Sequence, residues 1–182
     1  MLTIEIPGGT FWDEQQECFF KTDAATLNLE HSLISLSKWE SKWHKPFLSM
    51  KEKTPEEMLD YVRCMTLNKN VSPLSYKLLT PSDFKRINEY IDDKATATWF
   101  SDDKKKNKRR SREVITAEII YWWMIAQQIP FECQKWHLNK LLTLVRVCSI
   151  KNEGSKKMSP KAIGKQNAKL NAARHAAHRR RG

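Results

Sequence analysis

The stretch VITAEIIYWWMIAQQIPFECQKWHLNKLLTLVRVCSI, residues 114–150, decides the fold, because the apolar density of the sequence rises sharply here. The spacing predicts one helix from Val114 to Ile129, bounded by Pro130, and a second from about Phe131 to Ile150. Two adjacent helices this apolar are expected to pack as an antiparallel hairpin at the centre of the core. On the first helix a wide apolar face is expected to carry Ile115, Ile119, Trp122, Trp123 and Ala126, and on the second the inward residues are Trp136, Leu141, Leu144, Val145 and Cys148.

Three further helices are predicted upstream of this hairpin. The first ends before Pro46, and its residues Leu29, Leu33, Leu36, Trp39 and Trp43 recur at helical steps on one stripe. The other two begin with a threonine cap followed by proline, at Thr54-Pro55 and at Thr80-Pro81, where an acidic residue three positions after each threonine completes the signal. The expected buried faces carry Met58, Leu59, Val62 and Met65 in one helix and Phe84, Ile87, Tyr90 and Ile91 in the other.

The N-terminal residues are predicted to form strands. MLTIEI and ECFFK are expected to form a small β-hairpin on either side of the Pro7-Gly8-Gly9 turn. The predicted fold is therefore mainly α, a helical bundle-like domain with this hairpin. We expect one domain over residues 1–152, with a basic loop at 102–112, and a basic, marginally ordered tail over residues 153–182.

The positive charge sits in two short segments. The chain of 182 residues has a formal net charge of +11, from 32 Lys and Arg against 21 Asp and Glu. Without the two segments, 16 basic residues remain against 21 acidic ones, so the rest of the chain is mildly acidic. Such runs are most often solvated loops and tails. The first holds seven basic residues, Lys104, Lys105, Lys106, Lys108, Arg109, Arg110 and Arg112. The second is the sequence after Glu153, which holds nine basic residues and no acidic one and ends in Arg179, Arg180 and Arg181.

Catalytic and metal-binding patterns do not occur in the sequence. It has no G-x-S-x-G, no G-x-x-x-x-G-K-[ST], no G-x-G-x-x-G and no H-E-x-x-H. The four cysteines are scattered without a C-x-x-C pair, and His31, His44 and His137 are far apart along the chain. We therefore expect no catalytic residues, no metal and no cofactor, and a protein that is not an enzyme. The sequence has neither a long apolar run nor a secretory signal, so a soluble cytoplasmic protein without membrane contact is expected.

The tryptophans are the best candidates for a binding site. Indoles are favoured in protein interfaces because they bury a large area at low entropic cost, although one at helical spacing most often packs in the core. Trp122 and Trp123 cannot both face inward from one stripe, so one of them is expected to lie outside it. The candidate partner-binding residues are Trp39, Trp43, Trp122, Trp123 and Trp136.

Four strings carry a resemblance to a known family. They are LNLEHSLISLSKWESKWHKPFL at 27–48, RCMT at 63–66, IPFECQKWHLNKLLTLVRVCSIKN at 129–152 and KMSPKAIGKQNAKLNAAR at 157–174. The sequence resembles the tail assembly chaperones of long-tailed, siphovirus-type bacteriophages, nearly from end to end.

The resemblance implies a small, largely helical, non-enzymatic protein that coats the tape measure protein while tail tube subunits polymerise around it. Its partners would be the tape measure protein and the tail tube protein, with self-association as a further possibility. It implies the cytoplasm of the infected bacterium as the location, and absence from the mature virion.

Two alternatives remain open at the level of sequence. One is a structural tail, neck or head-completion protein that is retained in the virion. The other is a nucleic-acid-binding regulator that would use the two basic segments, for which salt-dependent binding is the discriminating observation. Loose basic runs are weaker evidence than a basic folded face, so nucleic acid is the less favoured partner.

Overall fold

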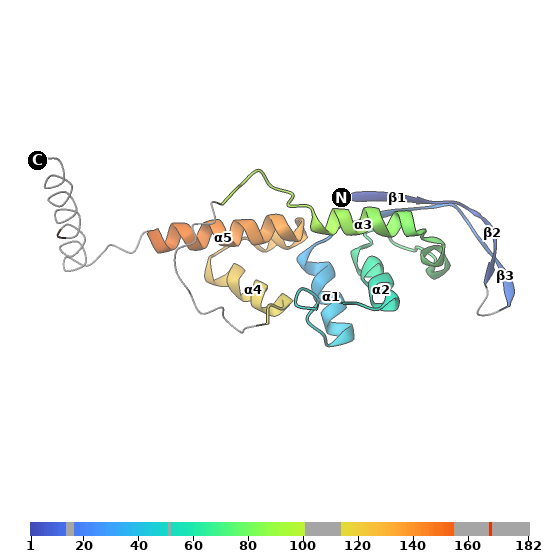
Figure 1. Cartoon of the computed structure of the whole chain (residues 1–182), viewed down its shortest axis with the longest axis horizontal. Coiled ribbons are helices and arrows are strands. Elements are labelled where there is room, and N and C mark those ends of the chain that lie inside the picture. Colours follow the sequence, from blue (N-terminus) through green and yellow to red (C-terminus); the bar gives the residue numbers. More distant parts are fainter. Residues whose placement is uncertain (14–16, 51, 101–113, 155–167, 169–182) are drawn as a thin grey trace, which may run out of the picture. The chain divides into compact units, whose positions relative to one another are not determined.

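A computed structural model describes residues 1–13, 17–50, 52–100, 114–154 and 168 (Figure 1). The predicted basic loop at 102–112 lies outside the described residues, as does the predicted tail apart from Glu153, Gly154 and Ala168. The elements in chain order are β1 Leu2–Ile6, β2 Gly9–Asp13, β3 Cys18–Thr22, β4 Ala25–Leu29, α1 Leu33–Trp43, α2 Pro55–Met65, η1 Pro73–Leu78, α3 Pro81–Asp92, α4 Ala117–Ala126, η2 Phe131–Lys135 and α5 Leu138–Gly154.

Helices predominate over strands among the described residues, and two small antiparallel strand pairs accompany them, so the structure is a small mixed fold. The chain divides into two compact units, Met1–Arg146 and Val147–Gly182. All the elements discussed below lie in the first unit, except the second half of α5. The bundle arrangement and the domain boundary after residue 152 stay predictions. No helix among the described residues has the length and apolar character needed to span a membrane.

The N-terminal strands pair differently from the prediction. β1 pairs with β4, with Ile4 opposite Leu27, while β2 pairs with β3, with Phe11 opposite Phe20. The expected hairpin between MLTIEI and ECFFK is therefore wrong. The two pairs meet at Gly8, where a Cβ atom would lie 2.6 Å from the backbone nitrogen of Ala24. Only glycine allows the two chain segments to approach this closely.

The capping signals are confirmed. Thr54 and Thr80 each form a reciprocal capping box, with Pro at the first helical position of α2 and α3. Val62 and Met65 are buried in α2, and Ile87 is buried in α3, whereas the other predicted inward residues of both helices are only half-buried. The first helix starts later than expected, because Ser32 caps α1 and the preceding Leu29 belongs to β4.

The predicted face of the helix at 117–126 is wrong. α4 buries Ala117, Ile120 and Met124, while Trp122 and Ile125 are exposed. Of the predicted inward residues, Ile119 and Trp123 are half-buried, and Ile115 and Ala126 are exposed. A helix that is apolar on every side gives no periodic signal for its buried face, so the packing partner decides it.

The expected single helix at 131–150 is two elements. η2 ends at Lys135, and α5 starts at Leu138 after an isolated bridge between Ser32 and His137. The backbone N–H of Leu138 donates to the carbonyl of His31 at 2.7 Å, a bond that a continuous helix would not leave available. Leu141 and Val145 are buried as predicted, whereas Leu144 and Cys148 are half-buried and Trp136 is 39% exposed.

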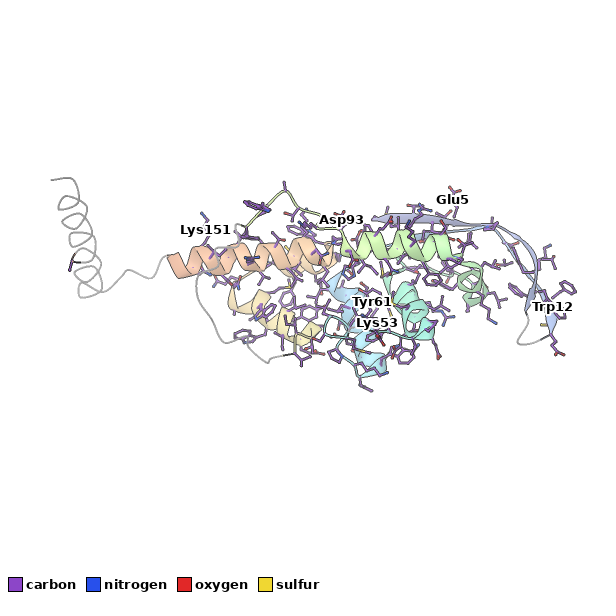
Figure 2. The ribbon with its side chains drawn as sticks, in the orientation of Figure 1. Glu5, Trp12, Lys53, Tyr61, Asp93 and Lys151 are labelled. Atoms are coloured by element: carbon purple, nitrogen blue, oxygen red, sulfur yellow. The ribbon has the colours of Figure 1, made fainter. Side chains whose placement is uncertain are left out.

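The centre of the first unit is α1. This helix packs closely against α2, α4 and η2, and its residues Leu33, Leu36 and Trp39 are fully buried. Among the described residues α4 packs more closely against α1 than against α5, so α1 rather than an α4–α5 hairpin lies at the centre. Tyr61 of α2 lies in the interior beside α1 in Figure 2 and is also fully buried.

Candidate partner-binding surface

Trp39 and Trp43 hold α1 against α2. The indole N–H of Trp39 donates to the carbonyl of Glu57 at 2.9 Å, and that of Trp43 donates to Asp60 Oδ2 at 2.8 Å. Their rings stack with centroids 6.1 Å apart. Trp39 is fully buried and offers no surface to a partner in this structure, whereas Trp43 is half-buried.

Two ion pairs border the same interface. Lys42 Nζ lies 2.5 Å from Asp60 Oδ1, and Lys45 Nζ lies 2.5 Å from Glu57 Oε1. The hydrogen bond from Lys45, followed by the backbone bond from Thr54, holds the pKa of Glu57 below its ordinary value. The α1–α2 contact is therefore already saturated with its own polar partners, and it is not a free binding surface.

The buried carboxylate of Glu40 positions α4. Its Oε1 accepts from the backbone N–H of Phe47 at 2.9 Å, and its Oε2 accepts from the backbone N–H of Ala117 at 2.7 Å. Thr116 makes no side-chain cap, so Glu40 satisfies a backbone donor at the start of α4 in its place. Burial raises the pKa of Glu40, and the two backbone bonds oppose that rise. The sequence contains one signal that could have identified Glu40 as a buried residue. It lies four residues after Leu36, on the buried side of the apolar stripe of this helix.

Once α4 is fixed in this way, its opposite side is uncovered. Trp122 is 63% exposed and Ile125 is 61% exposed, one helical turn apart on the same side. Phe131 of η2 is also exposed, and its ring contacts Tyr121, the residue before Trp122, at a centroid distance of 6.5 Å. We call Trp122, Ile125 and Phe131 the α4 outer face. Glu118 is the only charged residue of α4, and Glu132 follows Phe131, so the α4 part of this surface is apolar with little charge.

The other predicted tryptophans lie near this face without completing it. Trp123 is half-buried, which agrees with the expectation that Trp122 and Trp123 cannot both face inward. Trp136 carries the ammonium of Lys140 over its ring, 4.6 Å from the centroid. No ring contact among the described residues links Trp122, Trp123 or Trp136 to the stack of Trp39 and Trp43, so the five predicted residues do not form one site.

A groove of about 850 Å³ lies between the β2–β3 strand pair and the helices α2 and α3. Trp12 and Phe20 line it from the strands, Leu59 and Phe84 line it from the helices, and Trp43 reaches it from α1. Trp12 and Phe19 also make an edge-to-face pair at 4.9 Å, and both are exposed. Trp12 lies at the far end of the strands in Figure 2.

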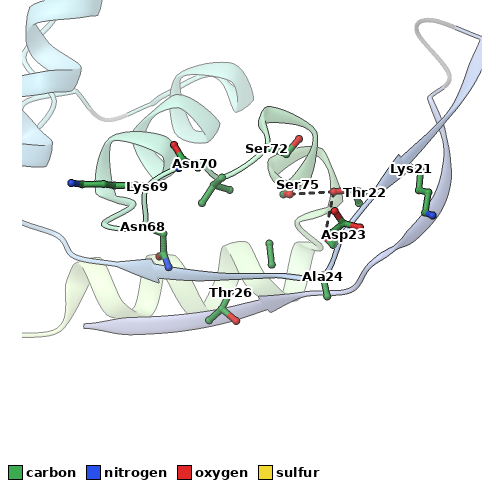
Figure 3. Close-up of a pocket in the computed structure, with 12 residues that line it drawn as sticks. Lys21, Thr22, Asp23, Ala24, Thr26, Asn68, Lys69, Asn70, Ser72 and Ser75 are labelled. Atoms are coloured by element: carbon green, nitrogen blue, oxygen red, sulfur yellow. Dashed lines mark hydrogen bonds between the residues drawn. The ribbon is translucent and has the colours of Figure 1, made fainter.

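A polar cavity of about 370 Å³ lies between the β3–β4 chain and residues 68–75 (Figure 3). One end is marked by the contact between Thr22 Oγ1 and Ser75 Oγ at 3.4 Å, and the other by the bond from the Asn28 backbone N–H to Asn68 Oδ1 at 2.7 Å. None of the predicted site residues lines this cavity, and its lining lacks the apolar character of the α4 outer face.

A buried histidine pair joins segments that are distant in sequence. The rings of His31 and His137 lie 5.2 Å apart, although they appeared isolated along the chain. His31 Nδ1 lies 2.6 Å from the Tyr61 hydroxyl, and His137 Nε2 donates to the Tyr90 carbonyl at 2.9 Å. Burial, with a smaller contribution from His137, lowers the pKa of His31 to about 3. The pair joins the segment between β4 and α1 to the residue before α5, and its hydrogen bonds reach Tyr61 of α2 and Tyr90 of α3.

The remaining predicted residues give no further site. Among the described residues, no group of three or more His, Cys, Asp or Glu side chains is arranged to hold a metal ion. The cationic residues of the nucleic-acid alternative lie outside the described residues: Lys104, Lys105, Lys106, Lys108, Arg109, Arg110, Arg112, Arg179, Arg180 and Arg181.

Comparison with known proteins adds no relative. No protein-family model matches this chain, and no curated protein or solved structure matches it.

Proposed function

We propose that this chain is a tail assembly chaperone of a long-tailed bacteriophage, a non-enzymatic protein that binds the tape measure protein and keeps it soluble while the tail tube polymerises. The observation that carries the proposal is the α4 outer face, with Trp122 and Ile125 both more than half exposed. The resemblance of four sequence strings to that family supports the same reading.

The α4 outer face suits a helical, apolar partner. A tape measure protein is a long helical chain with apolar faces, which aggregate when they are uncovered. Two anchors one turn apart on a helix match the spacing with which an amphipathic helix presents its own apolar residues. The absence of charge on the face, Glu118 excepted, removes the desolvation cost of such a contact.

Co-expression with the tape measure protein of the same phage tests the proposal. The intact chain should keep that protein in the soluble fraction. Replacing Trp122 and Ile125 by alanine should weaken binding of the purified complex by about 2 kcal/mol or more, roughly 30-fold in Kd, because exposed aromatic anchors dominate interface energies. Unfolding in urea should be little changed, since neither side chain packs in the core.

Trp99→Ala is the matched control, because Trp99 is 80% exposed and lies outside α4. It should leave the solubility of the tape measure protein unchanged. Equal loss of binding in both variants would contradict the assignment of the α4 outer face.

The location of the protein separates the leading proposal from a structural role. A chaperone acts in the cytoplasm of the infected bacterium and is released before the tail is complete. Mass spectrometry of purified virions should therefore find tail tube peptides and no peptides of this chain. Recovery of the chain at the same abundance as other tail proteins would favour a structural tail or neck protein instead.

A further inference from the structure

An aromatic and cationic cavity lies between α5 and the segment that follows α3. Its volume is about 400 Å³, a size suited to a nucleotide-sized ligand. Lys94, Trp99, Phe100 and Arg146 line it, together with hydroxyl and amide side chains. None of these four residues was a candidate at the sequence level, and none belongs to the α4 outer face.

Trp99 provides an open aromatic platform. Its side chain is 80% exposed, the largest exposure among the exposed large apolar residues of the described chain. Beside it, the guanidinium of Arg146 lies over the ring of Phe100, 4.1 Å from the centroid. A nucleobase can stack on an exposed indole of this kind. The neighbouring arginine is held in place by its cation–π contact with Phe100.

The walls of the cavity are held by polar contacts. The Asn139 side-chain amide donates to the carbonyls of Ile91 and Asp93, at 2.9 and 2.7 Å. Thr143 Oγ1 donates to the carbonyl of Asn139 at 2.8 Å. The two bonds from Asn139 tie α5 to the end of α3, and the bond from Thr143 lies within α5. The cavity wall is therefore supported by hydrogen bonds.

The charge of the lining is positive. Lys94 and Arg146 are cationic, and none of the described residues that line the cavity is acidic. The carboxylate of Asp93, next to Lys94 in the chain, accepts the backbone N–H of Ala95 at 3.1 Å. Cations beside a stacking platform complement a ligand that combines phosphates with unpaired bases.

We infer that this cavity, defined by Lys94, Trp99, Phe100 and Arg146, is a binding site for single-stranded nucleic acid. Trp99 stacks on a base, and Lys94 and Arg146 contact the adjoining phosphates. An acidic peptide would use the two cations but would leave the indole without a matching group. Duplex nucleic acid keeps its bases stacked inside the helix, so it cannot use Trp99.

Fluorescence anisotropy on the full chain tests the site. The probes are fluorescein-labelled oligothymidylate and oligouridylate of about 16 nucleotides, the upper range of a single-strand site. Trp99→Ala should weaken binding of the preferred probe by about 5-fold to 100-fold, because one base stack is lost. The preferred probe then shows whether DNA or RNA is the better ligand.

A second variant tests how much Lys94 and Arg146 contribute to binding of the probe. Lys94→Gln combined with Arg146→Gln should reduce the slope of log affinity against log salt by about 1.4, since each phosphate contact on a single strand contributes about 0.7. Trp122→Ala is the control and should bind the probes as the parent chain does. Loss of tape measure binding in Trp122→Ala together with intact probe binding would show that the two sites are separate.

Three results would overturn the inference. One is equal affinity for duplex and single-stranded probes. Another is competition by polyglutamate as effective as that by unlabelled oligothymidylate, which would indicate attraction to any polyanion. The third is unchanged affinity in Trp99→Ala while neutralisation of residues 104–112 abolishes binding, because the cavity would then not be the site.

Discussion

The carboxylate of Glu40 on α1 accepts a hydrogen bond of 2.7 Å from the backbone N–H of Ala117, at the start of α4. Its second oxygen accepts the backbone N–H of Phe47. One buried side chain thus fixes the turn after α1 and the position of α4. The exposure of Trp122 and Ile125 follows from this bond, because α4 has apolar residues on every side and could otherwise bury another face.

Glu40→Ala should lower the free energy of unfolding by about 2–4 kcal/mol, because two buried backbone donors lose their acceptor. Glu40→Gln keeps one acceptor oxygen and should cost less. Urea denaturation followed by tryptophan fluorescence measures both. Glu118→Ala is the matched control, since this exposed carboxylate lies in the first turn of the same helix and should change stability by about 0.5 kcal/mol or less.

Acid should destabilise the fold through His31. Its pKa is about 3 in the folded chain against an ordinary value of 6.5, so below pH 6.5 the unfolded chain takes up a proton that the folded chain does not. The stability provided by neutral His31 is complete above pH 6.5 and is lost as the pH falls toward 3. Between pH 6.5 and 5 the loss should be about 1.5–2 kcal/mol.

His31→Asn keeps a polar group facing Tyr61 and removes the titration. Its unfolding free energy should be lower than that of the parent chain at pH 7 but flatter between pH 6.5 and 5. The control is His44→Asn, because His44 is exposed and Asn tolerates its left-handed backbone at φ 53°. An unchanged pH slope in His31→Asn would show that this histidine does not govern acid sensitivity.

Leu141 and Leu144 of α5 should differ in a mutational test. Leu141 is fully buried, and Leu141→Ala should cost about 2–5 kcal/mol. Leu144 is half-buried, so Leu144→Ala should cost less than half as much as Leu141→Ala. Thermal unfolding of the two variants provides the comparison. Similar costs would mean that Leu144 lies deeper than this structure places it.

Gly8→Ala should disturb the junction between the two strand pairs. The added Cβ would lie 2.6 Å from the backbone nitrogen of Ala24, so the strands must separate, at a cost of about 1–3 kcal/mol. Amide hydrogen exchange should quicken in β1 and β4. Thr10→Ala, at an exposed position of the neighbouring strand β2, should leave the exchange in β1 and β4 unchanged.

Local signals in the sequence were predictive, and long-range ones were not. The capping boxes at Thr54 and Thr80 depend on residues three apart, and both are present as predicted. The pairing of β1 with β4 joins residues 19 to 27 positions apart, and the turn signal at Pro7-Gly8-Gly9 suggested a nearer partner. Nothing within one strand specifies its partner when two alternatives carry similar apolar residues.

The exposed face of α4 was only partly predictable. Adjacent tryptophans on one helix indicated that one of them would be exposed, and Trp122 is that residue. Spacing could not separate Trp39, which donates its indole N–H to Glu57 inside the core, from a tryptophan at the surface. The Trp99 cavity depends on α5 lying beside the segment after α3, which sequence periodicity does not encode.

The hydrogen bond between Glu40 and Ala117 also bears on how the chain folds during synthesis. Its two residues are 77 positions apart, whereas the partners in the α1–α2 contacts are 12 to 18 apart. Because the N-terminal part leaves the ribosome first, α1 and α2 can pair before α4 has been translated. The apolar α4 then emerges next to a surface that already carries its carboxylate anchor, which shortens the time its buried side is exposed to water.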